Sequence, residues 1–326
     1  MTDRTNRTAL VTGANSGLGL EAAAQLADDG YGRVVITART DSKAEAARQD
    51  LQTRTGANVF ETVTLDLDDH ATVASAAETL TERGGQIDVL LLNAGIAPTK
   101  EVTRTSDGIE ATVAATLIGH HLLTMRLLEA GLLSDQARIV IAGSEAARGD
   151  VPMFKPVDID ALAREKFDGD REAAIEALMR MDSPIKYDSG NQYATVKVFA
   201  AWWAAELAQK LPKGMTVVAV SPGSTPDTNA VRSAPFLMKR VLIPFFKLVP
   251  GMSHTVGDGA GRYLEVVGYG PEHSGKFFAS KPKKMTGPLH EMDMDHFGNP
   301  GARQALWNVT SKVAGGVGYP AQAPGR

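Results

Sequence analysis

Tyr193 and Lys197 stand four residues apart in the sequence Tyr-Ala-Thr-Val-Lys, and on a helix this spacing places both side chains on one face. A tyrosine with its ordinary pKa of about 10 holds its proton too tightly to exchange it readily near neutral pH. A nearby ammonium group favours the phenolate and lowers that pKa. The pair therefore predicts a tyrosine that exchanges a proton with a substrate oxygen, and a surface pair is the alternative. Tyr187 has no such partner, because Asn191 occupies the matching position.

A glycine-rich loop follows the first strand-like run of the chain. Glycine lets backbone N–H groups approach a phosphate without an intervening Cβ, and a helix N-terminus adds positive dipole character. The position between the first strand and the first helix predicts a pyrophosphate site, with a plain turn as the alternative. Three residues separate the first two glycines, unlike the G-x-G of the common dinucleotide fingerprint. The predicted contacts are Gly13, Asn15, Ser16, Gly17, Leu18 and Gly19.

The elements that must position these residues are visible as short apolar runs that alternate with segments of helical spacing. Runs rich in Val, Ile and Leu are typical of parallel strands buried on both faces. Their alternation with helices predicts an α/β fold, a doubly wound parallel sheet with right-handed crossovers, in a single domain over residues 1–314. The predicted strands are Thr8–Thr12, Arg33–Ala38, Val59–Leu65, Val89–Leu92, Arg138–Ala142 and Val217–Val220. The predicted helices between them include Leu18–Ala27, Lys43–Arg54 and Thr72–Arg83.

Three segments do not fit this alternation. Residues 150–189 form an insertion with a helix expected around Arg171–Met181, and residues 226–256 are apolar and interrupted by prolines. Both segments are expected to enclose a substrate. The insertion would contribute an apolar wall from Met153, Phe154, Met179 and Met181, and the second segment would form a lid from Phe236, Leu237, Met238, Val241, Leu242, Ile243, Phe245 and Phe246. A subunit interface or a membrane-surface contact are the alternatives for the lid. The Gly- and Pro-rich residues 315–326 are expected to be disordered.

Further motifs follow the predicted strands in order. They are Asp66 at the end of the third strand, Asn93-Ala94-Gly95 after the fourth, Ser144 after the fifth and Pro222-Gly223 after the sixth. With the glycine loop and the tyrosine–lysine pair, they make the chain resemble the short-chain dehydrogenase/reductase family from about Thr8 to about Ala279. The segments Arg39–Lys43, Gly119-His120 and Ala305-Leu306-Trp307 resemble the retinol dehydrogenase branch, and the insertion resembles that of protochlorophyllide reductase.

The resemblance implies a Rossmann-type fold and a role for each motif. It implies that Ser144 binds the substrate oxygen, that Tyr193 is the catalytic acid/base, and that Lys197 also binds the nicotinamide ribose. Beyond the glycine loop, the implied cofactor contacts are Arg39, Asp66, Leu67, Asn93, Ala94, Gly95, Tyr193, Lys197, Pro222 and Gly223.

Two positions on the segment after the fourth strand need their own interpretation. Thr116 stands where the family has a catalytic asparagine that holds a proton-relaying water, and a threonine offers a different shape and donor set. His120 and His121 are adjacent, point away from each other on a helix and have no carboxylate cluster beside them. We interpret them as structural and predict no metal site.

The residues after the second strand indicate which nicotinamide cofactor binds. Enzymes that use NAD place a carboxylate there to hold the ribose hydroxyls. Here the strand ends in Ala38, Arg39 follows, and Lys43 comes one turn later. A guanidinium is a rigid fork of donors that suits a phosphate. The sequence therefore predicts NADP(H), and a solvated loop residue is the alternative interpretation of Arg39.

Composition excludes several other classes of protein. The 326 residues carry a formal net charge of −4 and contain no cysteine, so disulfides and thiol chemistry are absent and no basic excess suggests nucleic acid. No segment looks apolar for long enough to span a membrane, and no signal peptide is recognisable at the N-terminus. A cytoplasmic protein is expected, with a small-molecule substrate and a homodimer or homotetramer as its possible assembly.

Together these observations predict an NADP(H)-dependent oxidoreductase that transfers a hydride between the nicotinamide and a bulky, apolar carbonyl or alcohol. Two alternatives remain: NADPH-dependent reduction of an activated C=C bond, and a non-catalytic NADP-binding sensor that has kept the fold.

Overall fold

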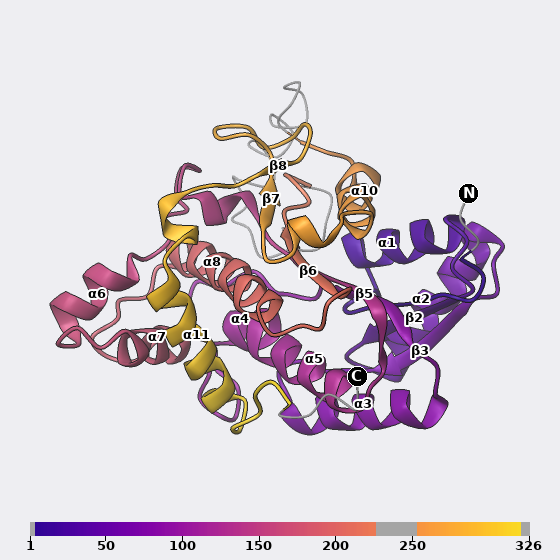
Figure 1. The fold of residues 1–326 in the computed structure, drawn as a ribbon, viewed down its shortest axis with the longest axis horizontal. Coiled ribbons are helices and arrows are strands. Elements are labelled where there is room, and N and C mark those ends of the chain that lie inside the picture. The colour runs from indigo at the N-terminus through magenta and orange to yellow at the C-terminus, as the bar shows by residue number, and fades with distance from the viewer. Residues whose placement is uncertain (1–3, 226–252, 321–326) are drawn as a thin grey trace.

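The computed structural model describes residues 4–225 and 253–320. These residues form one eight-stranded sheet with helices on both faces (Figure 1). The strand order is β3-β2-β1-β4-β5-β6-β7-β8, and every pair is parallel except β7 with β8. This is the doubly wound, Rossmann-type α/β arrangement that the sequence predicts. The strands are β1 (Thr8–Val11), β2 (Arg33–Ala38), β3 (Phe60–Thr64), β4 (Ile87–Leu92), β5 (Leu133–Ala142), β6 (Thr216–Val220), β7 (Phe277–Ala279) and β8 (His290–Glu291).

The helices divide between the two faces of the sheet. Those named α1, α2 and α10 cover one face, and α3, α5 and α8 cover the other (Figure 1). The helices are α1 (Gly17–Asp28), α2 (Asp41–Thr55), α3 (His70–Arg83), α4 (Ala111–Val113), α5 (Gly119–Glu129), α6 (Ile159–Lys166), α7 (Arg171–Arg180), α8 (Ser189–Ala208), α10 (Val256–Val267) and α11 (Pro300–Val313). Shorter turns are the π-helix η1 (Ala114–Ile118) and the 3₁₀ helices η2 (Glu145–Arg148), η5 (Pro271–His273) and η6 (Asp295–Phe297).

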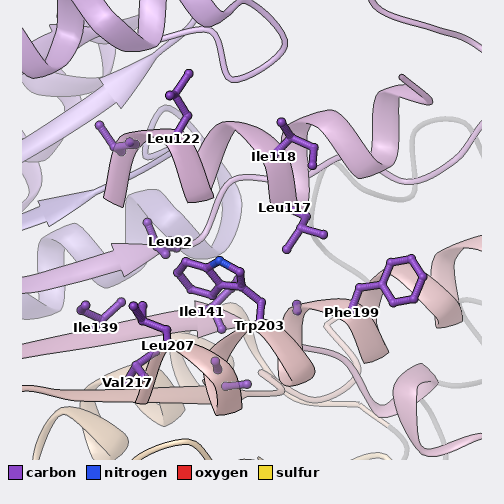
Figure 2. Packing of buried hydrophobic residues seen from close by; sticks show 14 of the residues in the cluster. Leu92, Leu117, Ile118, Leu122, Ile139, Ile141, Phe199, Trp203, Leu207 and Val217 are labelled. Atoms are coloured by element: carbon purple, nitrogen blue, oxygen red, sulfur yellow. The ribbon is translucent and has the colours of Figure 1, made fainter. Parts of the chain in front are cut away.

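Each strand contributes side chains to two hydrophobic layers, because successive side chains alternate between the two faces of the sheet. In β4, Leu90 and Leu92 pack with α3, α5 and α8, whereas Val89 and Leu91 pack with α1 and α10. The layer on the α8 side is centred on Trp203, which is fully buried between strand and helix residues (Figure 2). The central stretches of the strands are therefore mostly apolar, as expected for parallel strands buried on both faces.

The insertion differs from the expectation that it encloses the substrate along its whole length. It holds two helices, α6 and α7, which pack against each other, and α7 also packs against the C-terminal helix α11 (Figure 1). Lys312 on α11 reaches Glu176 on α7 at 2.7 Å. Met179 and Met181 are buried, at 0% and 7% exposure, and neither lines the cavity at the strand ends, so the structure does not support the prediction that they form a substrate wall.

The C-terminal segment is held against the helix layer by His121. Trp203 donates its indole N–H to His121 Nδ1 at 3.0 Å, so Nε2 carries the ring proton and donates to the carbonyl of Val317 at 2.7 Å. Burial lowers the pKa of His121 to about 4, which keeps the ring neutral at pH 7. Val317 and Tyr319 pack on the core, so the expectation of a disordered tail does not hold for residues 315–320.

One expectation about membranes also needs correction. Ala111–Glu129 is long and apolar enough to cross a membrane by length and composition alone, with a mean hydropathy of 1.2. However, 89% of its apolar window is buried inside the protein, as in the core helix of a globular fold.

Candidate active site

A cavity of about 530 Å³ opens at the carboxyl ends of the strands, where the strand order reverses between β1 and β4. Ligands of doubly wound sheets bind at this switch point. The cavity is lined by residues from almost every motif that the sequence singles out: Gly13, Asn15, Ser16, Gly17, Leu18, Gly19, Arg39, Lys43, Asp66, Leu67, Asn93, Ala94, Gly95, Tyr193, Lys197 and Pro222. Ser144 and Gly223 do not line the cavity. Ser144 is hydrogen-bonded to Tyr193, and Gly223 follows Pro222, and both of these partners do line it.

The glycine loop has the shape of a phosphate cradle. Gly13 adopts a φ of +63°, and a Cβ built on it would lie 2.9 Å from the Cβ of Ala94. A Cβ on Gly19 would collide with the side-chain amide of Asn93. Ser16 is the N-cap of α1 but makes no side-chain hydrogen bond to the helix, so it satisfies none of the helix's first N–H groups. Bare backbone and a free helix N-terminus fit the pyrophosphate of a dinucleotide.

A buried histidine holds the loop against its neighbours. His120 Nδ1 lies 3.0 Å from the carbonyl of Thr116, which can only accept, so Nδ1 carries the proton and Nε2 accepts from the Thr12 hydroxyl at 2.9 Å. Thr12 in turn accepts from the N–H of Ala94 at 3.0 Å, and its carbonyl accepts from Asn93 at 2.9 Å. Burial lowers the pKa of His120 to about 3, so the ring is neutral.

Both histidines therefore have structural partners, His120 in this network and His121 in its bonds with Trp203 and Val317, in keeping with the interpretation from the sequence. Within the described ranges, no group of three or more His, Cys, Asp or Glu side chains is arranged to hold a metal ion.

Two cations stand at the adenosine end of the cavity. Arg39 is exposed directly after β2, and Lys43 lies in the first turn of α2. Neither side chain has a hydrogen bond or ion pair with another described residue. Asp66 and Asp68 lie on the same end, where burial and then the charge of Asp66 raise the pKa of Asp68 to about 6. Two unpaired cations fit the 2′-phosphate of NADP.

Ser144, Tyr193 and Lys197 come together at the opposite end. Ser144 follows β5 and accepts from the N–H of Ala146 at 3.2 Å, and a hydrogen bond joins it to Tyr193. Lys197 Nζ donates to the carbonyl of Ala142 at 2.8 Å. The same Nζ lies 5.7 Å from the centroid of the Tyr193 ring. Helix α8 therefore presents tyrosine and lysine on one face toward the end of β5, as the spacing predicts.

The expected effect of the lysine on the tyrosine is not what the structure shows. Burial raises the pKa of Tyr193 above its ordinary value, the Ser144 hydrogen bond opposes this, and the charge of Glu145 adds to the rise. Burial lowers the pKa of Lys197 to about 8. The prediction that Lys197 lowers the pKa of Tyr193 was therefore wrong for the protein alone. The phenol stays protonated at neutral pH, which suits a proton donor.

Thr116 sits in the π-helical turn η1 between α4 and α5. It is 2% exposed, and its hydroxyl has no hydrogen-bond partner among the described residues. A Cβ added to Gly95, which lines the cavity, would lie 3.2 Å from that hydroxyl. Turns with π geometry inside α-helices often mark functional sites. Thr116 therefore presents an unused donor and acceptor beside the cavity wall.

The start of the insertion lies over the tyrosine. The rings of Phe154 and Tyr193 meet edge to face, with centroids 5.9 Å apart. The N–H of Lys155 donates to Asn191 at 3.0 Å and that of Val157 to Thr195 at 3.0 Å, so this stretch is fastened to α8. Phe154 thus contacts the ring of Tyr193, but it is not among the residues that line the cavity, so its place in a substrate wall stays a prediction.

Several residues of the cavity were not predicted from the sequence. They are Thr37, Ala38, Leu65, Asp68, Ile96, Ala97, Ala115, Ala142, Gly143 and Tyr263. Most adjoin a predicted motif, and their inclusion follows from strand ends that converge. Tyr263 comes from α10, far along the chain, and nothing in its local sequence marks it. Most of the predicted lid, residues 226–252, lies outside the described residues.

Known proteins are similar to this chain in sequence and in fold. A family model described as short chain dehydrogenase matches residues 7–156. Protochlorophyllide reductase of Chlamydomonas reinhardtii is 28% identical, over 95% of this chain and 78% of that protein. Retinol dehydrogenase 12 of Homo sapiens is 29% identical, over 94% and 85%. Dehydrogenase/reductase SDR family member 13 of Bos taurus is 30% identical, over 95% and 73%. The chain therefore belongs to the short-chain dehydrogenase/reductase family, a family of oxidoreductases.

A solved structure gives the same result for the fold. It is described as a short chain dehydrogenase from Burkholderia cenocepacia J2315 in complex with NADP. The TM-score is 0.59 at 24% identity, over 84% of this chain and 95% of that one. The retinol dehydrogenase and protochlorophyllide reductase matches confirm the branch that the sequence motifs resemble.

Proposed function

We propose that this protein is an NADP(H)-dependent oxidoreductase that transfers a hydride between the nicotinamide and a carbonyl or alcohol substrate. One observation carries the proposal. A single cavity joins the cations Arg39 and Lys43 at one end to Tyr193 and Lys197 at the other, with the glycine loop between them. When bound, the reduced nicotinamide supplies the hydride. The NADP named in the description of the Burkholderia structure agrees with this cofactor.

The protein's own groups supply the rest of the chemistry. Hydride addition to a carbonyl builds negative charge on its oxygen, so a donor and a polarising group are needed there. Tyr193 is protonated and its hydroxyl lies beside that of Ser144, so a substrate oxygen placed between them could accept from both in place of the bond that joins them. Lys197 is 6% exposed and tied to β5, which fixes its ammonium group behind the tyrosine.

Two other functions make different predictions for the same cavity. Reduction of an activated C=C bond is favoured by the similarity to protochlorophyllide reductase. It would consume NADPH with a conjugated ketone but yield the saturated ketone instead of the alcohol. A sensor without turnover is favoured only by Thr116 in place of the family's asparagine. It would bind NADPH but oxidise none.

The test is a panel of aldehydes and ketones with NADPH, read by loss of NADPH absorbance and by identification of products. Alcohol formation from unconjugated ketones supports the proposal. Formation of only the saturated ketone from a conjugated ketone would favour reduction of the C=C bond instead. Tight NADPH binding without oxidation by any member of the panel would favour the sensor.

The contact of Phe154 with Tyr193 gives a prediction about substrate size. Phe154→Ala is expected to raise the KM of a large apolar ketone about ten-fold, because it removes apolar contact surface worth ~1.5 kcal/mol or more. A small ketone should be affected little, since it would not reach the ring. Phe167→Ala, at the end of α6 in the same insertion, is the matched control. Steady-state kinetics with both ketones decides the matter: an equal rise for both would remove Phe154 from the substrate wall.

The free hydroxyl of Thr116 gives a second prediction. Thr116→Val keeps the shape of the side chain and removes the unpartnered hydroxyl, which could hold a water that passes protons beside Gly95. We expect kcat to fall about ten-fold with the Kd of NADPH unchanged. Thr112→Val is the control, because Thr112 has an equally buried, unpartnered hydroxyl one turn earlier. Equal kcat values for the two variants would show that the Thr116 hydroxyl takes no part.

A further inference from the structure

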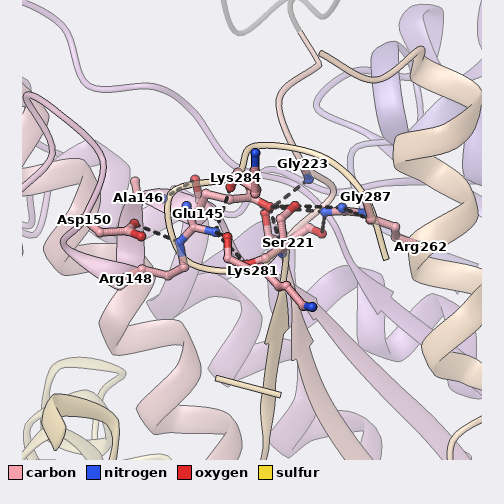
Figure 3. A network of polar contacts seen from close by, with 12 residues as sticks. Glu145, Ala146, Arg148, Asp150, Ser221, Gly223, Arg262, Lys281, Lys284 and Gly287 are labelled. Atoms are coloured by element: carbon pink, nitrogen blue, oxygen red, sulfur yellow. Dashed lines mark hydrogen bonds and ion pairs between the residues drawn. The ribbon is translucent and has the colours of Figure 1, made fainter. Parts of the chain in front are cut away.

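A buried ion pair joins Glu145, the residue after Ser144, to Arg262 (Figure 3). Glu145 follows Ser144 and is 2% exposed, and Arg262 on α10 is 4% exposed. Arg262 Nη1 lies 3.2 Å from Glu145 Oε1. Burying two charges costs desolvation energy that their attraction often fails to recover, so such a pair is weak evidence for a purely stabilising role. The contacts of Glu145 and Arg262 show which parts of the site the pair holds.

The carboxylate of Glu145 reaches the turn after β6 through one hydroxyl. Ser221 is fully buried, and its hydroxyl donates to Glu145 Oε2. The same hydroxyl accepts from the N–H of Gly223 at 3.2 Å. The chain of contacts therefore runs from the residue after Ser144, through Ser221, to the turn whose Pro222 lines the cavity beside the tyrosine and lysine.

Arg262 holds the same strand end from the other side. It donates to the carbonyl of Ser221 at 3.0 Å, to Ser280 Oγ at 2.8 Å and to the carbonyl of Gly287 at 2.6 Å. Gly223 has a φ of +81°, and a Cβ on it would collide with the ring of His254 and lie 3.1 Å from Arg262 Nη1, so the turn packs against both side chains. Arg262 thus holds the backbone carbonyl of Ser221, and Glu145 holds its hydroxyl.

We propose that Glu145 is a positioning residue: through the Ser221 hydroxyl it fixes the Pro222-Gly223 turn relative to Ser144, and so sets the nicotinamide end of the cofactor against the reacting groups. The proposal rests on the proposed function in taking NADPH as the ligand. Misplacement of reacting groups by about 1 Å can cost ~10²-fold in rate, so a fixed link between the two walls has a direct kinetic value.

Ser221→Ala tests the link without unbalancing the ion pair. Glu145→Gln would leave Arg262 buried without its counter-charge and could prevent folding. Ser221→Ala removes only the hydroxyl that joins Glu145 to Gly223. Ser280→Ala is the matched control: its fully buried hydroxyl also bonds Glu145, at 3.0 Å, and Arg262, but not the turn. The two variants therefore lose similar bonds to the same pair.

The readouts separate positioning from stability. In Ser221→Ala we expect the Kd of NADPH to rise about 3- to 10-fold and kcat at saturating NADPH to fall about ten-fold. The Kd of 2′,5′-ADP, which lacks the nicotinamide, should stay unchanged. Ser280→Ala should match the wild type in all three measurements, with a similar loss of Tm to that of Ser221→Ala.

Unchanged NADPH binding and kcat in Ser221→Ala, or equal changes in both variants, would overturn the positioning role. Weaker binding of 2′,5′-ADP in Ser221→Ala would do the same, because it would show a general loss of structure. The binding comparisons need no carbonyl substrate. Hence a wild-type protein that binds NADPH but reduces nothing would refute the proposed function and still decide the role of Glu145.

Discussion

Replacement of Tyr193 by Phe is expected to lower kcat for ketone reduction by about 10²- to 10⁴-fold, the range that a positioned general acid contributes. The phenylalanine keeps the ring and its edge-to-face contact with Phe154, so the wall of the cavity should survive. Only the transferable proton and its bond to Ser144 are lost. The Kd of NADPH should change less than about two-fold, since the glycine loop and Lys197 are intact.

Tyr187→Phe is the control for this experiment. Tyr187 lies on the segment just before α8, and its hydroxyl donates to the carbonyl of Thr99 at 2.9 Å. Burial raises the pKa of Tyr187 to about 12, and no lysine follows it at helical spacing. The control should keep nearly full kcat. Single-turnover and steady-state rates for both variants give the comparison, and full activity in Tyr193→Phe would place the acid/base elsewhere.

The fold was predictable where the sequence repeats a strong local pattern. Six strands buried on both faces read as apolar runs, and the observed β1 to β6 fall on them within a few residues. The last two strands of the sheet, β7 and β8, were missed because they have only three and two residues. Helix α6 was missed as well, since its amphipathic pattern spans only two turns.

The site was predictable only in those parts that depend on local motifs. Strand ends converge in any doubly wound sheet, so motifs that follow the strands had to meet. Contacts that depend on tertiary packing could not be predicted from the sequence. Glu145 and Arg262 are separated by more than a hundred residues and form their pair only when α10 packs against the sheet. The raised pKa of Tyr193 has the same origin, because burial is a property of the folded protein.

The same limit explains the error about the insertion. Met179 and Met181 looked like a flexible apolar wall because both lie between Ser144 and Tyr193 in the sequence. In the structure, α7 packs against α11, and both methionines are buried in the hydrophobic core on the α8 side of the sheet. The sequence could predict only that the two ends of the insertion lie near Ser144 and Tyr193. Which of its apolar residues approach the cavity depends on how α7 packs in the folded protein.

Replacement of Arg39 by Ala is expected to raise the Kd of NADPH about 10- to 100-fold and to leave the Kd of NADH within about two-fold. The reason is that a guanidinium bound to a phosphate contributes charge-assisted hydrogen bonds worth ~1.5–3 kcal/mol, and NADH lacks the 2′-phosphate. Arg39 is exposed and unpaired among the described residues, so its removal breaks no internal bond. Lys43 remains as a second cation and should keep some preference for NADPH.

Arg48→Ala separates this effect from a general change of surface charge. Arg48 lies on the same helix α2, carries the same charge and pairs with Glu45 at 2.6 Å, but it does not line the cavity. Both cofactors should bind this variant as they bind the wild type. Titration of each protein with NADPH and NADH, followed by cofactor fluorescence, gives the four affinities needed for each comparison. Equal wild-type affinity for the two cofactors, or equal losses in Arg39→Ala and Arg48→Ala, would show that Arg39 does not recognise the 2′-phosphate.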